Sequence, residues 1–353
     1  MRVSDFDFHL PPELIAQEPP VERGTSRLLH LDRRTGVLAH RSIIDLPHLL
    51  DPGDVLVVND TRVFPARLLG RRDPSWGAVE CLLLTRLDEP DAAGAERWEA
   101  LVHPGQKLKP GARLVFEGHV PLEGEVLERR FFGRRAVRLW TPDGSPVARA
   151  VDAIGHMPLP PYIKRPDRAS DRERYQTVYA QSRGSIAAPT AGLHFTPGLL
   201  ASLDRRGIER AAITLHVGYG TFQPIRVEMV EEHRMELEPF EISDAAARAI
   251  NAALDAGRRI VAVGTTTTRA LESVARANGG RIVAGRGATD LFIHPGFDFR
   301  VLSGLQTNFH LPQSSLLMLV SAFAGRERVL DAYREAVARG YRFYSYGDAM
   351  LML

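Results

Sequence analysis

The stretch Asp54-Val55-Leu56-Val57-Val58-Asn59-Asp60 is an apolar run without a break, bounded by acidic and amide side chains. Because it is apolar on both faces, we expect a strand covered on both sides, as in a parallel sheet layered with helices. Upstream, Arg27–Asp32 indicates another strand, and Leu10–Ala16 indicates a short helix with Pro in its first turn. These segments together predict the beginning of an α/β domain.

The pattern changes between residues 64 and 151. Short alternating segments, among them Trp98–Val102 and Ala136–Trp140, are separated by turns rich in Pro, Gly and Asp, and no long helical pattern interrupts them. Such spacing favours a small antiparallel barrel or sandwich. We therefore expect residues 64–151 to form a β-domain inserted into a discontinuous α/β domain of residues 1–63 and 152–353.

Helix and strand patterns alternate again after a Pro-rich link at Ile154–Tyr162. The periodicity and capping residues predict helices at Pro197–Arg206 (capped by Thr196), Ser243–Ala256, Thr268–Ala277, Ser314–Ala324 and Glu327–Arg339, and strands at Arg210–Val217 and Arg259–Val263. This return to long periodic segments is the reason to treat the β-rich block as an insertion.

Composition points to a globular enzyme: 353 residues, 44% hydrophobic and 25% charged. No run reaches the length of a membrane span and the N-terminus lacks an apolar signal core, so we expect a cytoplasmic protein without a membrane partner. Cys81 is the only cysteine, which excludes an internal disulfide and argues against thiolate-held metal clusters. We expect it to be a buried structural thiol.

The net charge of +2 does not by itself indicate a nucleic-acid-binding protein. The basic residues are nevertheless almost all Arg, since Lys occurs only at 107, 109 and 164. Arginine suits bidentate phosphate contacts and stacking on bases, although genomic codon bias explains the same composition. Lys164-Arg165-Pro166-Asp167-Arg168, with tyrosines nearby, is a candidate phosphate-and-base surface or a solvated loop.

Four loops are rich in small and polar residues and in Gly or Pro, a composition that is typical of loops that contact ligands. They are residues 187–196, 215–222, 263–269 and 307–312. We expect one pocket assembled from them. In the first, His194 is a candidate catalytic or ligand-contacting residue, the alternative being a satisfied core histidine. The histidine spacing fits no common metal site, so we expect no bound metal.

The strand Arg259–Val263 runs into Gly264-Thr265-Thr266-Thr267-Thr268, a turn that places backbone N–H groups where an anion binds. Simple capping by threonines is the alternative. Neither a Walker A pattern nor a dinucleotide fingerprint is present. In the acidic segment after Glu228, Glu238 is the better pocket candidate because it follows the periodic apolar residues.

Several stretches, in one order, resemble a known family: NDTRVFPAR (59–67), GHMPLPPYI (155–163), APTAGLHF (188–195), TLHVG with GTFQP (214–224), VGTT (263–266), TNFHLP (307–312) and YRFYSYGDAM (341–350). On these motifs the chain resembles the S-adenosylmethionine:tRNA ribosyltransferase-isomerases of queuosine biosynthesis over essentially its whole length. Two positions depart from the family pattern: Glu236 stands where a second His is usual, and Thr267-Thr268 where Ser-Val is more common.

The resemblance implies a mixed α/β domain interrupted by an inserted six-stranded antiparallel β-barrel. It also implies that the ribosyl part of S-adenosylmethionine moves, with isomerisation, to 7-aminomethyl-7-deazaguanine at the wobble position of tRNA. The product would be epoxyqueuosine-tRNA, with release of adenine and methionine. S-adenosylmethionine would then be a co-substrate, no prosthetic group would be needed, and we expect a monomer.

Such chemistry needs proton transfer beside the sulfonium and at the wobble amine. We expect His194 to be the general base or acid, His216 its alternative, and Glu238 to face the sulfonium or the amine. The remaining site residues are expected to contact the donor and the modified base (Thr190, Gly192, Gly264, Thr265, Thr266, Arg269, Asn308 and His310) or tRNA phosphates (Arg165, Arg168 and Arg342).

Two other classes of protein remain open at this stage. A non-catalytic RNA-binding module would use the barrel as its platform and would show exposed aromatic residues and a basic stripe there. A Rossmann-type methyltransferase or dehydrogenase would need a glycine fingerprint after an early strand, and none is present.

Overall fold

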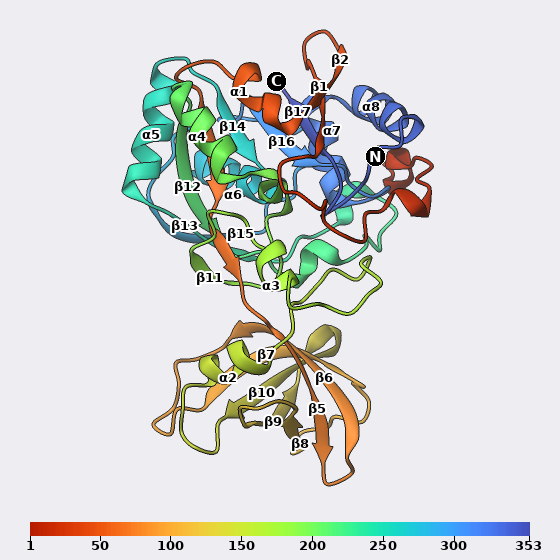
Figure 1. Ribbon diagram of the computed structural model, residues 1–353, viewed down its shortest axis with the longest axis vertical. Helices are drawn as coiled ribbons and strands as arrows, with labels where there is room; N and C mark the ends of the chain where they lie inside the picture. Colours follow the sequence, from red (N-terminus) through yellow and green to blue (C-terminus); the bar gives the residue numbers. More distant parts are fainter.

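The computed structural model describes residues 1–353, apart from the side chain of Phe222. Two units lie one above the other in Figure 1, a larger α/β unit that holds both termini and a smaller barrel. The predicted fold class, an α/β domain interrupted by a six-stranded antiparallel barrel, is confirmed. The exact boundaries 63/64 and 151/152 stay a prediction.

A nine-stranded mixed sheet forms the centre of the α/β unit, in the order β15-β13-β12-β3-β14-β16-β17-β1-β2. Its strands are β1 (Arg27–Leu31), β2 (Leu38–Ser42), β3 (Val55–Asn59), β12 (Glu209–Leu215), β13 (Glu238–Ile242), β14 (Ile260–Val263), β15 (Gly285–Thr289), β16 (Gly304–Asn308) and β17 (Ala349–Met352). The central strands β12, β3, β14 and β16 are parallel. Their carboxyl ends share one edge, and this edge faces the barrel because β3 leads into it.

Helices cover both faces of this sheet, as the apolar run in β3 predicts. Val55 and Val57 pack in one core with the helices of one face, and Leu56 and Val58 pack in a second core on the other face. The first face carries α5 (Asp244–Asp255), α6 (Thr265–Ala277), α7 (Ser315–Ala324) and α8 (Arg326–Ala338), and the second carries α1 (Leu46–Leu49) and α4 (Pro197–Arg205).

The barrel closes in the order β10-β7-β6-β5-β8-β9, with every pair antiparallel. Its strands are β5 (Arg67–Asp73), β6 (Gly77–Arg86), β7 (Glu96–His103), β8 (Arg113–Phe116), β9 (Leu122–Arg129) and β10 (Arg134–Trp140). Alternate residues of β6, including Cys81, point into a core that α2 (Val147–Ile154) helps to cover. Burial raises the pKa of the Cys81 thiol to about 12, as suits a structural residue.

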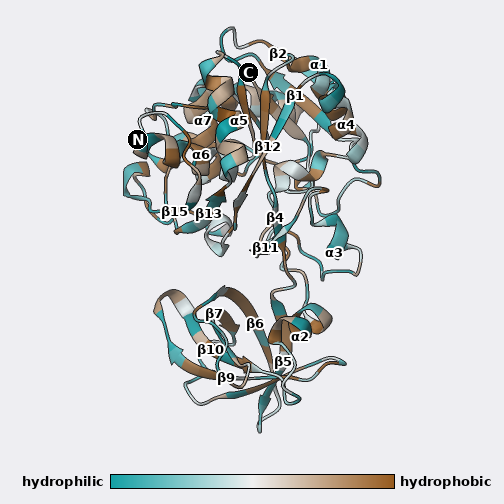
Figure 2. Cartoon of the chain, turned by 90° about the vertical axis from the view of Figure 1, so that its left-hand side faces the viewer, coloured by the Kyte–Doolittle hydropathy of each residue, from teal (hydrophilic) through white to brown (hydrophobic). Residues whose placement is uncertain are grey.

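Two short parallel strands, β4 (Thr61–Val63) and β11 (Ser182–Ser185), join the units, as Figure 2 shows from the side. A further short helix, α3 (Asp171–Arg174), lies in the returning chain. No helix in the described part of the chain is long and apolar enough to cross a membrane.

Two predicted helices differ from those observed. The helix expected at Leu10–Ala16 is only a 3₁₀ turn, Pro12–Leu14, because Ile15 then pairs with Phe343 in an extended bridge. The helix expected from Thr268 begins instead at Thr265. There the hydroxyls of Thr267 and Thr268 donate to the carbonyls four residues earlier, at 2.8 and 3.1 Å. All four threonines of this turn are buried, so tertiary packing outweighs the weak helix propensity of Thr.

Candidate functional site

One cavity lies where the central strands end toward the barrel. It has a volume of about 530 Å³, including the space open to solvent. Its walls are Tyr162, 187–191, Val217, Thr221, 264–266, 307–310, Leu316, Tyr344 and Ser345. Parts of all four loops singled out in the sequence therefore meet in one place, as expected for ligands bound at the carboxyl edge of an α/β sheet.

The N-terminus of α6 forms one wall of this cavity. Gly264 has a φ of 93°, a conformation that favours glycine, and it turns the chain from β14 directly into the 13-residue helix. Thr265 and Thr266 line the cavity, so the unpaired N–H groups of the first turn lie beside it. The predicted ligand contacts at 264–266 are thus brought to the cavity, and this wall suits an anionic group.

Asn308, at the end of β16, presents an unused acceptor. Its amide nitrogen lies 3.0 Å from the carbonyl oxygen of Tyr344 and 3.0 Å from Nε2 of His194. Because a carbonyl oxygen only accepts, the nitrogen must face it, which fixes the orientation of the amide. The Oδ1 atom is buried and has no partner among the described residues. It is an acceptor available to an N–H group of a ligand.

His194 lies behind Asn308 and does not line the cavity. Since its Nε2 accepts from Asn308, its proton is on Nδ1, which donates to Ser26 Oγ at 2.8 Å. Burial lowers the pKa of the imidazole to about 4, so the ring is neutral at pH 7. The structure therefore places His194 where it orients Asn308, and its direct role in proton transfer stays a prediction.

His310 lines the cavity directly. Its Nε2 atom lies 3.0 Å from the hydroxyl of Thr307, and burial lowers its pKa to about 3. Near neutral pH, this histidine offers a neutral hydrogen-bonding group rather than a positive charge. No group of three or more metal-ligating side chains occurs in the part of the chain that the structure describes.

Two tyrosines form an aromatic wall. The rings of Tyr162 and Tyr344 are nearly perpendicular, with centroids 3.8 Å apart, and the hydroxyl of Tyr162 contacts Ser345. Tyr344 has a φ of 73°, a conformation that costs a non-glycine residue about 1–3 kcal/mol. The sequence analysis did not predict five of the cavity residues, although they lie in its motifs: Tyr162, Thr221, Thr307, Tyr344 and Ser345. The aromatic composition of the YRFYSYGDAM motif was the available signal.

Glu238 and Arg269 form a buried ion pair beside the cavity, and neither side chain lines it. Glu238 also accepts from the backbone N–H of Gly218 at 2.9 Å and from the hydroxyl of Thr221 at 3.2 Å. Arg269 additionally donates to the carbonyl of Leu291 at 2.8 Å. The pair therefore holds the 218–221 loop in position, and a direct ligand contact by either residue stays a prediction.

His216 borders a second, larger hollow of about 2350 Å³ between the two units, called here the interdomain cleft. Val217 lines both this cleft and the smaller cavity, so the two adjoin. His216 Nδ1 lies 2.8 Å from the hydroxyl of Thr61, and burial lowers the pKa of the ring. Glu236 pairs across the cleft with Arg134 of the barrel, so at this position the chain has an interdomain contact.

The other two residues of the 187–196 loop that were predicted to contact a ligand, Thr190 and Gly192, differ in position. Thr190 lines the cavity, whereas Gly192 does not. A Cβ at Gly192 would lie 2.2 Å from the hydroxyl oxygen of Tyr179, so this glycine permits close packing behind the loop.

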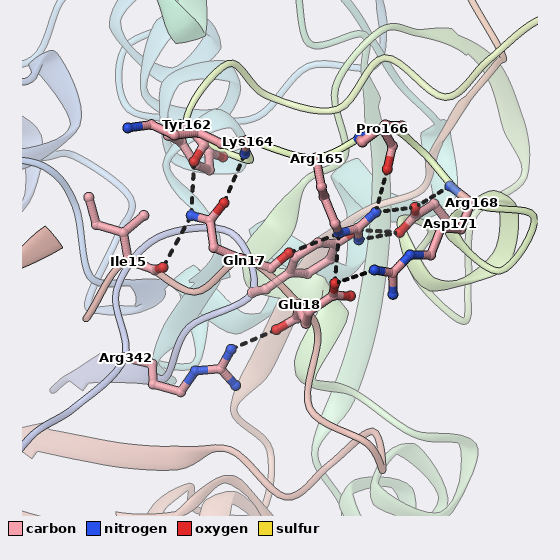
Figure 3. Close-up of polar contacts among 11 residues, drawn as sticks. Ile15, Gln17, Glu18, Tyr162, Lys164, Arg165, Pro166, Arg168, Asp171 and Arg342 are labelled. Atoms are coloured by element: carbon pink, nitrogen blue, oxygen red, sulfur yellow. Dashed lines mark hydrogen bonds and ion pairs between the residues drawn. The ribbon is translucent and has the colours of Figure 1, made fainter. Parts of the chain in front are cut away.

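The three arginines predicted to bind tRNA surround Glu18 (Figure 3). Arg165 is largely buried and makes two bonds to Asp171, at 2.7 and 2.9 Å. Arg342 donates to the backbone carbonyl of Glu18 at 2.7 Å. Arg168 pairs with the Glu18 carboxylate at 3.0 Å, yet its side chain is 63% exposed. Of the three, Arg168 is the most available for a phosphate, and tRNA binding by the group stays a prediction.

Comparison with known proteins agrees with this arrangement. Residues 3–352 match the model of the family described as "Queuosine biosynthesis protein". The chain is 54% identical to proteins from Heliobacterium modesticaldum and Moorella thermoacetica, each named S-adenosylmethionine:tRNA ribosyltransferase-isomerase, over 100% of both chains. It is also similar to the crystal structure of S-adenosylmethionine tRNA ribosyltransferase from Thermotoga maritima, with 39% identity, a TM-score of 0.55, and coverage of 99% of this chain and 100% of that chain.

Proposed function

Since the chain belongs to the queuosine biosynthesis protein family, we propose that it transfers and isomerises the ribosyl part of S-adenosylmethionine onto tRNA. The acceptor in this proposal is 7-aminomethyl-7-deazaguanine at the wobble position, and the products are epoxyqueuosine-tRNA, adenine and methionine. The observation that carries the proposal is a cavity whose wall groups match the parts of S-adenosylmethionine.

The charge of the cavity supports a sulfonium ligand. Among the described lining residues there is no Lys, Arg, Asp or Glu, and the one histidine, His310, is kept neutral by burial. A sulfonium cation therefore meets no positive side chain in the wall. In this proposal, the rings of Tyr162 and Tyr344, which line the cavity, supply the cation–π attraction to the sulfonium.

The polar walls match the two ends of the donor. In this proposal, the first turn of α6 at Thr265 and Thr266 holds the methionine carboxylate, since helix N-termini favour anions. The unused Oδ1 of Asn308 accepts from an amino group, and His310 supplies a neutral hydrogen bond to a purine edge.

The acceptor amine approaches in this proposal from the interdomain cleft, beside Val217. His216 borders that side, and its lowered pKa keeps it unprotonated at neutral pH, so it is able to take the proton that the amine must lose. His194 supports the site through Asn308, and the Glu238–Arg269 pair supports it through the 218–221 loop.

The test is incubation with S-adenosylmethionine and tRNA that carries the deazaguanine, followed by measurement of the small products. Release of adenine with methionine supports the proposal, with tRNA bearing guanine at the wobble position as the control. Release of S-adenosylhomocysteine instead identifies methyl transfer. Binding of the tRNA without any turnover identifies a non-catalytic module, and either result contradicts the proposal.

A further inference from the structure

The connection between β9 and β10 exposes two large aromatic side chains. Phe131 and Phe132 are 87% and 89% exposed, more than any other aromatic residue among the exposed hydrophobic residues of the described chain. The segment reads Arg129-Arg130-Phe131-Phe132-Gly133-Arg134-Arg135, so four arginines flank the pair. Isolated exposed apolar residues are ordinary, but adjacent phenylalanines set among arginines are a specific feature.

This turn, called here the Phe131–Phe132 tip, is held in a defined conformation. Phe132 adopts φ 55° and ψ 34°, the left-handed region that a bulky residue rarely occupies. The buried guanidinium of Arg135 donates to the carbonyl oxygens of Gly133 and Arg134, at 3.2 and 2.8 Å. The fold therefore maintains an unfavourable backbone at a position where it also leaves both rings in water.

The tip borders the interdomain cleft, the hollow that adjoins the cavity at Val217. Across the cleft, the α/β unit presents Leu237, which is 65% exposed. A flexible chain lying in the cleft would contact the tip and still reach the cavity.

The cleft wall carries four arginines (Arg86, Arg130, Arg134 and Arg183) and three glutamates (Glu96, Glu99 and Glu236), a formal excess of one positive charge. The carboxylate of Glu99 is already paired with Arg134 at 2.8 Å, and Glu236 pairs with the same arginine. Arg129 does not line the cleft itself but lies next to the cleft-lining Arg130, and it is exposed and forms no ion pair among the described residues. Aromatic rings beside arginines are the combination that binds unpaired nucleotides, because bases stack on rings while phosphates meet guanidinium groups.

We propose that the Phe131–Phe132 tip stacks on unpaired bases of an RNA loop that lies in the interdomain cleft, with Arg129 against its phosphates. The inference rests on the proposed function only for the identity of the RNA, which is then the anticodon loop of the tRNA substrate. It assigns to the barrel the platform role that the sequence left open.

The test measures the affinity of a labelled anticodon stem-loop RNA for the full chain and for the double variant Phe131→Ala/Phe132→Ala. Both rings are exposed, so we expect unchanged thermal unfolding and an RNA dissociation constant raised at least about fivefold, the lower limit for losing one stacked base. The affinity for S-adenosylmethionine should not change. The matched control is Trp76→Ala, since Trp76 is 59% exposed with φ 58° but lies in the β5–β6 turn, at the far end of the barrel in Figure 1.

A second variant tests the phosphate contact. Arg129→Gln should lower the slope of log affinity against log salt by about 0.7, the value for one single-strand phosphate. Arg248→Gln, at an exposed arginine on α5, should leave the slope unchanged.

RNA affinity equal to the parent in the double Phe variant would overturn the proposal. So would a change in self-association without RNA, which would identify the tip as an interface between copies of the chain. Because binding is measured without turnover, the result stands even if the parent releases no adenine, so the two proposals fail separately.

Discussion

Replacing His194 by Gln should remove a defined part of the pH dependence of stability. His194 is buried, bonded at both ring nitrogens, and has a pKa of about 4, against an ordinary value of 6.5. Because the folded-state pKa is the lower one, the unfolded chain binds the extra proton as pH falls. The stabilisation is therefore fully present above about pH 6.5 and is lost progressively toward pH 4. Glutamine keeps a neutral polar side chain but cannot titrate.

The size of the effect follows from the two pKa values. Between about pH 7.5 and pH 5, preferential protonation of the unfolded chain at this one site lowers the free energy of unfolding by about 2 kcal/mol. The parent should lose this amount in addition to the contributions of its other titrating groups. His194→Gln should be less stable than the parent at neutral pH, since the glutamine amide cannot reproduce both bonds, but its stability should fall less with acid.

The assay is urea unfolding of both proteins at the two pH values, with two signals. All three tryptophans lie in barrel strands or turns, so their fluorescence follows the barrel and serves as an internal control. Far-ultraviolet circular dichroism follows the helices, which lie mainly in the α/β unit. An equal loss of stability with acid in parent and variant, within about 0.5 kcal/mol, would refute the reasoning.

Three further predictions concern the site and its surroundings. His194→Ala should lower turnover by about 10²- to 10⁴-fold with little change in tRNA affinity, measured by adenine release and RNA binding; near-native turnover in a folded variant would remove the residue from the mechanism. Glu238→Gln should destabilise the protein by about 3–5 kcal/mol because Arg269 is left charged and buried without its partner, and a thermal unfolding curve unchanged from the parent would contradict this. Arg168→Ala should lower the slope of log tRNA affinity against log salt by the contribution of about one phosphate contact. Arg165→Ala should chiefly lower the stability of the protein, because Arg165 is paired with Asp171. An unaltered slope in the Arg168 variant would place the tRNA contact elsewhere.

Elements with a strong local pattern were predictable. The apolar run of β3, the Thr196 cap of α4 and the turn-punctuated strands of the barrel all appear where the sequence indicates. The start of α6 was predicted three residues late because threonine disfavours helices, and the packing that overrides this preference buries all four threonines of the first turn. Local propensity carries no information on such packing.

For the site, the sequence determined which loops take part, since Gly, Pro and Thr in a short segment after a strand indicate backbone close to a ligand. Only the tertiary structure decided which side chains face the cavity. His194 and His310 both stand in loops of similar composition, so the sequence does not distinguish them. In the structure, His310 lines the cavity, whereas His194 lies behind Asn308. Arg165 has the charge to bind phosphate, but Asp171 already occupies its guanidinium. A side chain's direction and its partners depend on packing between segments far apart in the chain, whereas a sequence pattern records only near neighbours.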